Sequence, residues 1–269
     1  MPVGFYVVDT ETTVPVVDCD LIGAAYISFV LLNLLYFTIF VKFFKDVLED
    51  DSVILFLYGA GDAAMEVYDM VMRNVSIKRR YSKVVFIDDF AEEAEFYGSM
   101  RIKFSSVESF RKGEDAEFAI TLGEPSNRKI LREKVTSAGY RLATLVADSV
   151  IVSPSAEIGE GCIVFDGTVI SSKSRLSTNC YVIFRVIIGH GAVVGEDSTI
   201  APTAIVGGNC VVGEQTFIGM RSSIMQGIKM GSKAIIGMGA IVFRDVEPGA
   251  TMLGNPARAS KGKDEHKVF

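Results

Sequence analysis

A bulky apolar residue recurs at every sixth position along the C-terminal half of the chain. The sixteen positions are Val152, Ile158, Val164, Ile170, Leu176, Val182, Ile188, Val194, Ile200, Val206, Val212, Ile218, Ile224, Met230, Ile236 and Val242. Neither a helix of 3.6 residues per turn nor a strand of period two keeps one face apolar under an unbroken period of six. A coil with three flat faces of six residues each does. The repeat therefore predicts a left-handed parallel β-helix, in which every bulky residue points into a triangular prism.

The residues that flank each bulky position fit the same coil. A small side chain mostly stands two residues before it, and glycine follows it in eight of the sixteen hexads, as at Gly189 and Gly207. We expect these glycines to supply unusual backbone angles at the corners of the prism. Residues eighteen apart should stack in one column, about 4.8 Å from coil to coil.

Three of the four cysteines, Cys162, Cys180 and Cys210, occupy the small slot of a hexad, and the fourth is Cys19. They are expected to be small buried thiols in a reducing compartment rather than a disulfide framework. Cys162 and Cys180 share a column, so these two should be neighbours.

Length and charge narrow the classes of function. With 269 residues the chain is long enough for two domains. A net charge of −6 and a pI near 5.1 argue against nucleic acid as a main partner, because binding DNA or RNA needs a basic surface. Only two histidines are present, His190 and His266. A zinc site of three histidines is therefore excluded, and no metal is expected.

The segment 21–41 contains no charged residue. Its 21 residues are enough to cross a bilayer as a helix. Acidic residues precede it, and Lys42 and Lys45 follow at once. The lysine bias places its C-terminal side in the cytoplasm. We therefore expect a cytoplasmic protein tethered to the inner membrane by this segment. The alternative is a buried helix of a soluble domain.

Between this segment and the β-helix, strand and helix patterns alternate. Strands are predicted over 53–58, 84–87, 118–122 and 142–146. One helix is expected after residue 61, and another is expected to be capped by Ser126 and to run to about Ala138. Such alternation is typical of a small parallel sheet. The chain is thus predicted to comprise an N-terminal extension (1–50), a Rossmann-like α/β domain (52–147), the β-helix (148–260) and a polar tail (261–269).

Two motifs of the α/β domain suggest a Rossmann-like site for a phosphate and a sugar or ribose. The first strand runs into a glycine turn with Gly59, Gly61 and Asp62, where backbone N–H groups at a helix N-terminus can meet an anion. The second strand ends in Asp88 and Asp89, which are placed to accept hydrogen bonds from a ribose or sugar hydroxyl. The alternative is a glycine turn that serves only the packing of strand against helix.

The order of these parts resembles a known family. A short Rossmann-like domain opens with GAG, a strand ends in FIDD, and a β-helix follows that contains VIIGHGAVVGEDSTIAP (186–202), IIGMGAIVFRDVEPG (235–249) and GNPAR (254–258). This resembles the sugar O- and N-acetyltransferases, which include bacterial sialic acid O-acetyltransferases and acetyltransferases of UDP-4-amino-sugars. The resemblance implies a homotrimer in surface glycan biosynthesis, with acetyl-CoA between neighbouring prisms and a nucleotide-sugar on the N-terminal domain.

The resemblance also implies a catalytic base. His190 matches the family's histidine in the sequence GH, whereas His266 lies in the polar tail. Acetyl transfer needs such a base to take a proton from the attacking amine or hydroxyl. It also needs an N–H donor for the carbonyl oxygen of the thioester. By the eighteen-residue spacing Gly208 stacks on His190, so we expect its N–H to be that donor.

Candidate contacts to acetyl-CoA follow from the same resemblance. The family's pantetheine runs along the backbone of the later coils, and arginines pair with the phosphates. In this chain the corresponding residues, besides Gly208, are Gly219, Met220, Gly237, Met238, Arg244 and Arg258. The alternative is that these glycines and methionines serve only the geometry of the corners.

Three positions depart from the family. Gly191 stands where an acidic residue usually orients the histidine, Ile183 where asparagine is common, and Ala63 where a histidine would face the sugar. An acid from a neighbouring subunit, or Asp197, is a possible substitute for the missing partner. These departures leave open a second function, a non-catalytic trimeric module that binds a nucleotide-sugar or serves as a scaffold.

Overall fold

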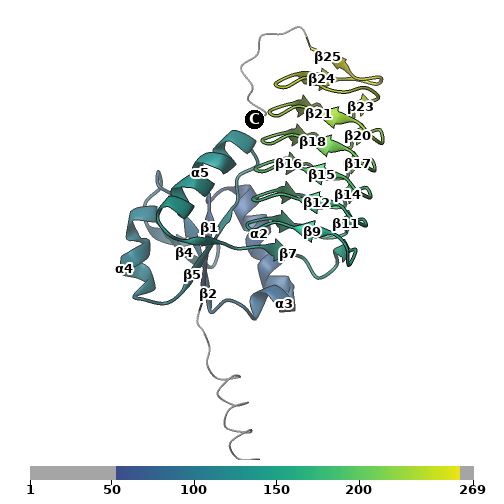
Figure 1. Ribbon diagram of the computed structural model, residues 1–269. Helices are drawn as coiled ribbons and strands as arrows, with labels where there is room; N and C mark the ends of the chain where they lie inside the picture. The colour runs from purple at the N-terminus through teal and green to yellow at the C-terminus, as the bar shows by residue number, and fades with distance from the viewer. Residues whose placement is uncertain (1–52, 261–269) are drawn as a thin grey trace, which may run out of the picture. The chain divides into compact units, whose positions relative to one another are not determined.

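In a computed structural model, which describes residues 53–260, an N-terminal mixed α/β domain is followed by a parallel β-helix (Figure 1). The α/β domain holds one six-stranded sheet with the order β3-β4-β2-β1-β5-β6. The β-helix holds three further sheets, and every pairing within its coils is parallel. The predicted order of an α/β domain and a β-helix is confirmed.

The elements of the α/β domain follow one another along residues 54–142. They are β1 (Ile54–Tyr58), α2 (Asp62–Arg73), α3 (Val75–Lys78), β2 (Lys83–Ile87), β3 (Ala94–Phe96), β4 (Ser99–Ile102), the 3-10 helix η1 (Phe104–Ser106), α4 (Val107–Arg111), β5 (Ala116–Ile120), α5 (Pro125–Ser137) and β6 (Arg141–Leu142). Strands β1, β2 and β5 are parallel and form the buried centre of the sheet. Their carboxyl ends therefore meet at one edge, where the glycine turn and the acidic pair lie.

Three details of this domain differ from the sequence prediction. The hairpin of β3 and β4 was not predicted, because its strands are short and largely exposed. Helix α5 begins at Pro125 after Glu124, with no side-chain cap, so Ser126 is not its N-cap. Proline suits this first position, because the missing N–H would have had no partner there. The predicted strand 142–146 is two short strands, β6 in the α/β sheet and β7 in the β-helix.

From β7 to β23 the β-helix consists of two-residue strands joined by four-residue corners. The first sheet, here sheet B, contains β7 (Leu145–Val146), β10 (Ile163–Val164), β13 (Tyr181–Val182), β16 (Thr199–Ile200), β19 (Phe217–Ile218), β22 (Ile235–Ile236), β24 (Thr251–Leu253) and β25 (Arg258–Ala259). Sheet C contains β8 (Ile151–Val152), β11 (Val169–Ile170), β14 (Ile187–Ile188), β17 (Ile205–Val206), β20 (Ser223–Ile224) and β23 (Ile241–Val242). Sheet D contains β9 (Glu157–Ile158), β12 (Arg175–Leu176), β15 (Val193–Val194), β18 (Val211–Val212) and β21 (Lys229–Met230).

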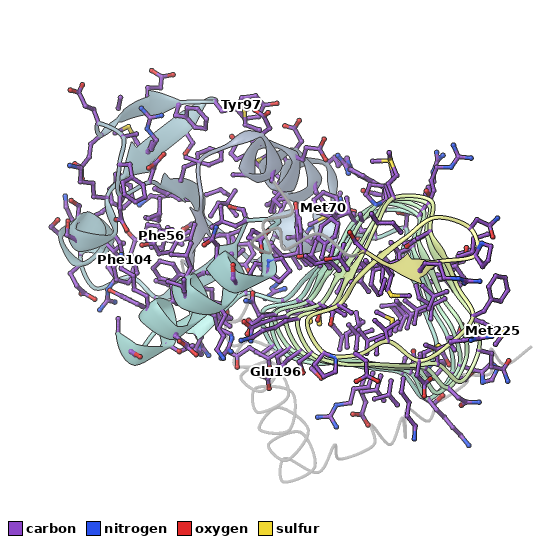
Figure 2. The ribbon with its side chains drawn as sticks, turned by 90° about the horizontal axis from the view of Figure 1, so that it is seen from above. Phe56, Met70, Tyr97, Phe104, Glu196 and Met225 are labelled. Atoms are coloured by element: carbon purple, nitrogen blue, oxygen red, sulfur yellow. The ribbon has the colours of Figure 1, made fainter. Side chains whose placement is uncertain are left out.

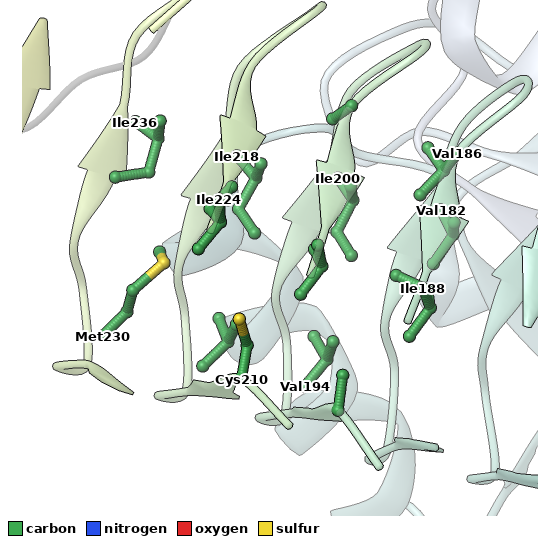
Figure 3. Packing of buried hydrophobic residues seen from close by; sticks show 14 of the residues in the cluster. Val182, Val186, Ile188, Val194, Ile200, Cys210, Ile218, Ile224, Met230 and Ile236 are labelled. Atoms are coloured by element: carbon green, nitrogen blue, oxygen red, sulfur yellow. The ribbon is translucent and has the colours of Figure 1, made fainter. Parts of the chain in front are cut away.

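The register confirms the eighteen-residue columns. Ile188 pairs with Val206, and Val194 with Val212, each eighteen residues further along. The bulky residues from Val164 onward are buried in one continuous core (Figure 3). Cys162, Cys180 and Cys210 lie in this core as free thiols, as predicted.

The corner glycines have a different role from the one we expected. Gly189 and Gly207, which directly follow the bulky residue, do not adopt a positive φ. A Cβ added to Gly189 would lie 2.5 Å from the backbone nitrogen of Gly208 in the next coil. Glycine is therefore required there because two coils approach closely. The left-handed conformation falls two residues later, at Gly191 (φ 63°) and at non-glycine residues such as Asn209 (φ 56°).

Helix α5 joins the α/β domain to the β-helix through two buried polar contacts. Arg128, which is fully buried, donates to the backbone oxygens of Ile120 and Leu122 in its own domain and to Asn179 in the prism, at 2.6–3.1 Å. One turn later Arg132 binds both carboxylate oxygens of Asp197, at 2.7 and 2.8 Å. Glu196, beside that pair, lies at the prism corner next to α5 (Figure 2).

Several predictions fall outside the residues that the structure describes. The candidate membrane segment 21–41, Cys19 and His266 all lie beyond residues 53–260. Within that range, no helix has the length and apolar character to cross a membrane. The membrane anchor and the cytoplasmic location stay predictions.

Candidate active site

His190 lies at the corner between sheets C and D. The chain leaves β14 at Ile188, turns through residues 189–192 and enters β15 at Val193. Because Ile188 points into the core, the turn carries the His190 side chain to the outside, where it is exposed. Met225 lies in the same corner two coils further on. Figure 2 shows this corner at the edge of the prism away from the α/β domain.

The imidazole of His190 lies against Gly208 of the next coil. A Cβ added to Gly208 would lie 2.5 Å from Nε2 and 2.6 Å from Cε1 of the ring. The absence of a side chain at Gly208 is therefore what makes room for the imidazole. Within residues 53–260 no acceptor pairs with the Gly208 N–H, while the Gly208 carbonyl accepts from Gly227 at 2.9 Å. The stacking predicted from the spacing thus places a histidine nitrogen beside a free backbone donor.

Two of the residues that depart from the family have structural explanations, and of these only Gly191 lies in the His190 corner. Gly191 has a φ of 63°, and the space that its Cβ would occupy is filled by Asn209 Oδ1, 2.4 Å away. Ile183 packs against the hydrophobic cluster of the α/β domain. An apolar contact between the two parts of the chain thus takes the place of a polar group there.

Asp197 is not available as an orienting acid for His190. It lies in the corner between sheets D and B, is 1% exposed, and accepts hydrogen bonds from Arg132 and from Asn179 Nδ2 at 2.7 Å. A buried carboxylate with these partners serves the contact with α5. The substitution of Asp197 for the missing partner, considered from the sequence, is wrong.

The glycine turn lies at the carboxyl edge of the α/β sheet. Gly59 (φ 111°) follows β1, and a Cβ there would meet Leu122 Cδ2 at 2.6 Å. Gly61 precedes α2 as its N-cap, and nothing lies within 4 Å of the position that its Cβ would occupy. Asp62 and Gly61 are both exposed, and Ala63 is half-buried behind them. The turn is therefore open to a ligand at Gly61, whereas Gly59 is required by packing.

The acidic pair at the end of β2 has divided roles. Asp89 accepts hydrogen bonds from Tyr58 Oη at 2.5 Å, Lys134 Nζ at 2.6 Å and the backbone N–H of Phe104 at 3.0 Å. Partial burial raises the pKa of Asp89, but the hydrogen bonds from Lys134 and Tyr58 outweigh it, so the net pKa lies below its ordinary value. Burial, and then the bond to Asp89, raises the pKa of Tyr58, which stays a neutral hydroxyl. Asp89 thus holds β1, η1 and α5 together.

Asp88 keeps part of its capacity for a ligand. Its Oδ1 accepts from the backbone N–H groups of Phe90 at 2.9 Å and Ala91 at 3.2 Å, which fixes the turn after β2. Among the described residues, Oδ2 of Asp88 has no hydrogen-bond partner. Sequence reasoning treated the two carboxylates alike, because adjacency in the chain does not show which of them a distant lysine will reach.

Comparisons with known proteins bear on this arrangement. The family model "Hexapeptide repeat of succinyl-transferase" matches residues 211–244. No curated protein sequence matches the chain. The acetyltransferase domain of PglB from Neisseria gonorrhoeae, solved with acetyl coenzyme A, has a TM-score of 0.70 at 26% identity, covering 78% of this chain and 100% of that one. The chain is a distant homologue of the hexapeptide-repeat sugar N-acetyltransferases.

Two more solved structures share the fold at lower identity. WeeI from Acinetobacter baumannii has a TM-score of 0.73 at 24% identity, covering 78% of this chain and 100% of that one. PerB from Caulobacter crescentus, in complex with CoA and GDP-perosamine, has a TM-score of 0.70 at 22% identity, covering 78% and 97%. A match over 78% of the chain includes residues of the α/β domain as well as the β-helix. The family model, by contrast, matches only residues 211–244 of the β-helix.

The candidate coenzyme contacts lie at two corners of the β-helix and on β25. Gly219 and Met220, with Gly237 and Met238 one coil above them, lie between sheets B and C. Met238 is 75% exposed. Arg244 is exposed in the same corner as His190, three coils on, or roughly 14 Å at the usual strand spacing. Arg258 is exposed on β25 and donates to its own neighbour, the Ala257 carbonyl. The candidate coenzyme contacts of one chain therefore do not lie together in a single site.

Proposed function

We propose that the protein is an acetyl-CoA-dependent acetyltransferase that acts on an amino or hydroxyl group of a nucleotide-activated or sialic-acid-like sugar in surface glycan biosynthesis. The observation that carries the proposal is the contact of the His190 imidazole with Gly208, whose N–H is free. It joins a base and an oxyanion donor on a β-helix whose distant homologue, the PglB domain, was solved with acetyl coenzyme A.

The reaction assigns one task to each of these groups. When bound, acetyl-CoA supplies the acetyl group as a thioester. His190 Nε2 takes the proton from the acceptor nitrogen or oxygen as that atom bonds to the acetyl carbon. The Gly208 N–H donates to the carbonyl oxygen, where negative charge develops. His190 then returns the proton to the sulfur as the carbon–sulfur bond breaks, and free coenzyme A leaves.

The remaining coenzyme contacts follow the prism surface. We assign the pantetheine to the exposed backbone at Gly219, Met220, Gly237 and Met238, and the phosphates to Arg244 and Arg258. In a left-handed β-helix these corners run parallel to the axis, so an extended chain can follow them. The two guanidinium groups are both exposed, and among the described residues no carboxylate pairs with either.

The α/β domain is proposed to hold the nucleotide-sugar. Its Rossmann-like turn presents Gly61 and Asp62 at the start of α2, where backbone N–H groups favour a phosphate. Asp88 offers its second oxygen to a sugar or ribose hydroxyl. Asp89, with three donors already bound, acts by holding the edge of the sheet in place.

A homotrimer is proposed because one chain leaves the acceptor far from the base. The His190 corner lies at the edge of the prism away from the chain's own α/β domain (Figure 2). Sheet C, which borders that corner, presents an apolar column to the outside, with Ile151, Ile187 and Ile205 being 66%, 41% and 40% exposed. A second copy packed on this column would cover it. Acetyl-CoA would then lie between neighbouring prisms, in contact with both corners.

Turnover of acetyl-CoA, measured as thiol release, tests the proposal. The panel contains UDP- and GDP-linked 4-amino-sugars and sialic acid, with a reaction lacking acceptor as the control. We expect acceptor-dependent release of coenzyme A with at least one sugar. Background release with every acceptor, together with retained binding of a nucleotide-sugar, would instead favour the non-catalytic binding module, which the glycine at position 191 also suggests.

The contact at Gly208 gives a second prediction. In Gly208→Ala the new Cβ would fall 2.5 Å from Nε2 of His190, so the imidazole must move. We expect kcat to fall by about tenfold, since a small displacement of a reacting group is costly. Gly227→Ala is the matched control, because nothing lies within 4 Å of its Cβ position, although its φ of 78° adds strain. Unchanged kcat in Gly208→Ala would refute the placement of the base.

The divided acidic pair gives a third prediction. Asp88→Asn keeps the oxygen that accepts from Phe90 and Ala91, and removes only charge and the free acceptor. We expect the Kd for the nucleotide-sugar to rise by about tenfold, the effect of one charge-assisted hydrogen bond, with thermal stability unchanged. Asp89→Asn should lower the melting temperature instead, because Lys134 loses its ion-pair partner. Calorimetric titration and thermal unfolding of both variants separate the two roles.

A further inference from the structure

In the His190 corner, two side chains of neighbouring coils each lie against a glycine of the other coil. They are His190, against Gly208, and Asn209, against Gly191. His190 rises over Gly208, and Asn209 descends over Gly191, with its Oδ1 2.4 Å from the position of a Gly191 Cβ. A backbone hydrogen bond joins the two coils at this point, because the Asn209 N–H donates to the His190 carbonyl at 2.7 Å. The imidazole and the carboxamide therefore lie side by side on stacked dipeptides.

Other polar groups in this corner are less well placed. One coil below His190 and Gly191 the register puts Ser172 and Lys173, and one coil above Gly208 and Asn209 it puts Gln226 and Gly227. Ser172 lies on the side from which the imidazole turns away, and its hydroxyl is bonded to Ser153 at 3.1 Å. The nearest carboxylate of the column is Asp245, which is three coils above Gly191 and accepts from Lys229. Charges in the column are thus Lys173 below, and Arg244 and Asp245 above.

We propose that Asn209 is the positioning residue for His190. A histidine acts as a base through one ring nitrogen only while the other is held by a hydrogen bond that fixes the tautomer and the ring orientation. Nε2 is directed at Gly208, so Nδ1 is the nitrogen that must be held. The carboxamide oxygen of Asn209 accepts from Nδ1–H and keeps Nε2 unprotonated and ready to take a proton. This inference rests on the proposed function.

A neutral partner has a defined consequence for the chemistry. When Nε2 takes its proton, the imidazolium is stabilised by the dipole of a carboxamide rather than by a full negative charge. Glycine at position 191 is then a requirement of the arrangement, because any side chain there would displace Asn209.

Asn209 has a competing explanation that the test must separate. Its φ of 56° lies in the left-handed region, which asparagine tolerates well for purely conformational reasons. Glycine satisfies that backbone equally, so Asn209→Gly removes the side chain without strain. Lys233→Gly is the matched control, since Lys233 is exposed, has a φ of 60° and lies at a different corner.

The experiment compares wild type, Asn209→Gly, Asn209→Asp, Lys233→Gly and His190→Ala in the full chain. Steady-state rates are measured from pH 5.5 to 9 with acetyl-CoA and the best acceptor of the panel. In Asn209→Gly we expect kcat to fall by about tenfold, the effect of one neutral hydrogen bond, with both KM values unchanged within about twofold. In Asn209→Asp we expect activity to be retained and the ascending limb of the pH profile to move up by about one pH unit, because a carboxylate stabilises the imidazolium.

A second measurement does not depend on turnover. Nitrogen-15 NMR of the His190 ring, in a chain that also carries His266→Gln, reports the tautomer and the pKa directly. We expect the Nδ1–H tautomer to dominate in wild type, to lose its dominance in Asn209→Gly, and the pKa to rise in Asn209→Asp. Equal tautomer populations and an equal pKa in all three would overturn the inference.

The outcomes separate this inference from the proposed function. Wild-type kinetics in Asn209→Gly, beside an inactive His190→Ala, would remove Asn209 from the mechanism and leave the base in place. Full activity in His190→Ala would remove the base itself. Equal losses in Asn209→Gly and Lys233→Gly would identify a conformational role only, and would also overturn the inference.

Discussion

Replacing His190 by alanine is expected to lower kcat by at least about a hundredfold, the scale on which a general base contributes. No second imidazole lies among residues 53–260 to take over the proton. The loss should appear in kcat, because the exposed ring contributes to proton transfer and little to the hold on the coenzyme. Thiol release under saturating acetyl-CoA and acceptor measures it.

Two controls make that result specific. The melting temperature of His190→Ala should be close to that of wild type, since the side chain is exposed and lies outside the hydrophobic core. The Kd for acetyl-CoA should also stay within about threefold, because His190 makes no contribution common to ground and transition states. A variant that keeps more than about a third of the wild-type kcat would contradict a base at this position, given the size expected of that role.

The β-helix could be derived from the sequence because its rule is local and repetitive. An inward residue at every sixth position fixes three faces, and stacking then fixes the column of every other residue. That is why the eighteen-residue spacing alone assigns Gly208 to His190. The role of the corner glycines was predicted less well. Glycine at a turn suggests a special backbone angle, whereas here Gly189 avoids a collision with Gly208 of the next coil.

In the α/β domain the hydrophobic pattern of the sequence predicted the buried strands but not the exposed ones. Its buried strands β1, β2 and β5 have apolar runs and were predicted, while the exposed hairpin of β3 and β4 was not. The partners of Asp89 were also unforeseen, because Tyr58 and Lys134 lie 31 and 45 residues away along the chain. Contacts between charged side chains of distant elements leave no periodic signal.

Arg128 is the most consequential of these unforeseen residues. In the sequence it is a charged residue on a helix rich in other charges, and such residues are usually solvated. In the structure it is fully buried, with five hydrogen bonds to three backbone carbonyls and the Asn179 side chain, and it stacks on Tyr181 at 5.0 Å. Burial lowers the pKa of Arg128 to about 10, which leaves the guanidinium charged at neutral pH.

Arg128→Met is therefore expected to lower the free energy of unfolding by about 4 kcal/mol, since buried acceptors on both sides of the joint lose their donor. Methionine roughly keeps the volume, so the effect reports lost hydrogen bonds more than a cavity. Arg128→Lys should recover only part of the loss, because an ammonium cannot reproduce the planar fork that reaches Ile120 and Asn179 together. Urea unfolding at fixed protein concentration measures all three chains.

Arg80 provides the matched control. It also bonds to a backbone carbonyl and a carboxylate, Thr144 at 2.9 Å and Glu117 at 3.2 Å, but its side chain is 47% exposed. Arg80→Met should cost at most about 1 kcal/mol, because water replaces the lost partners. If Arg128→Met cost no more than Arg80→Met, the α/β domain would not depend on this joint for its place on the prism. A loss confined to Arg128 would show that this buried cation contributes strongly to the hold of the α/β domain on the β-helix, in addition to the contact of Arg132 with Asp197 one coil above Asn179.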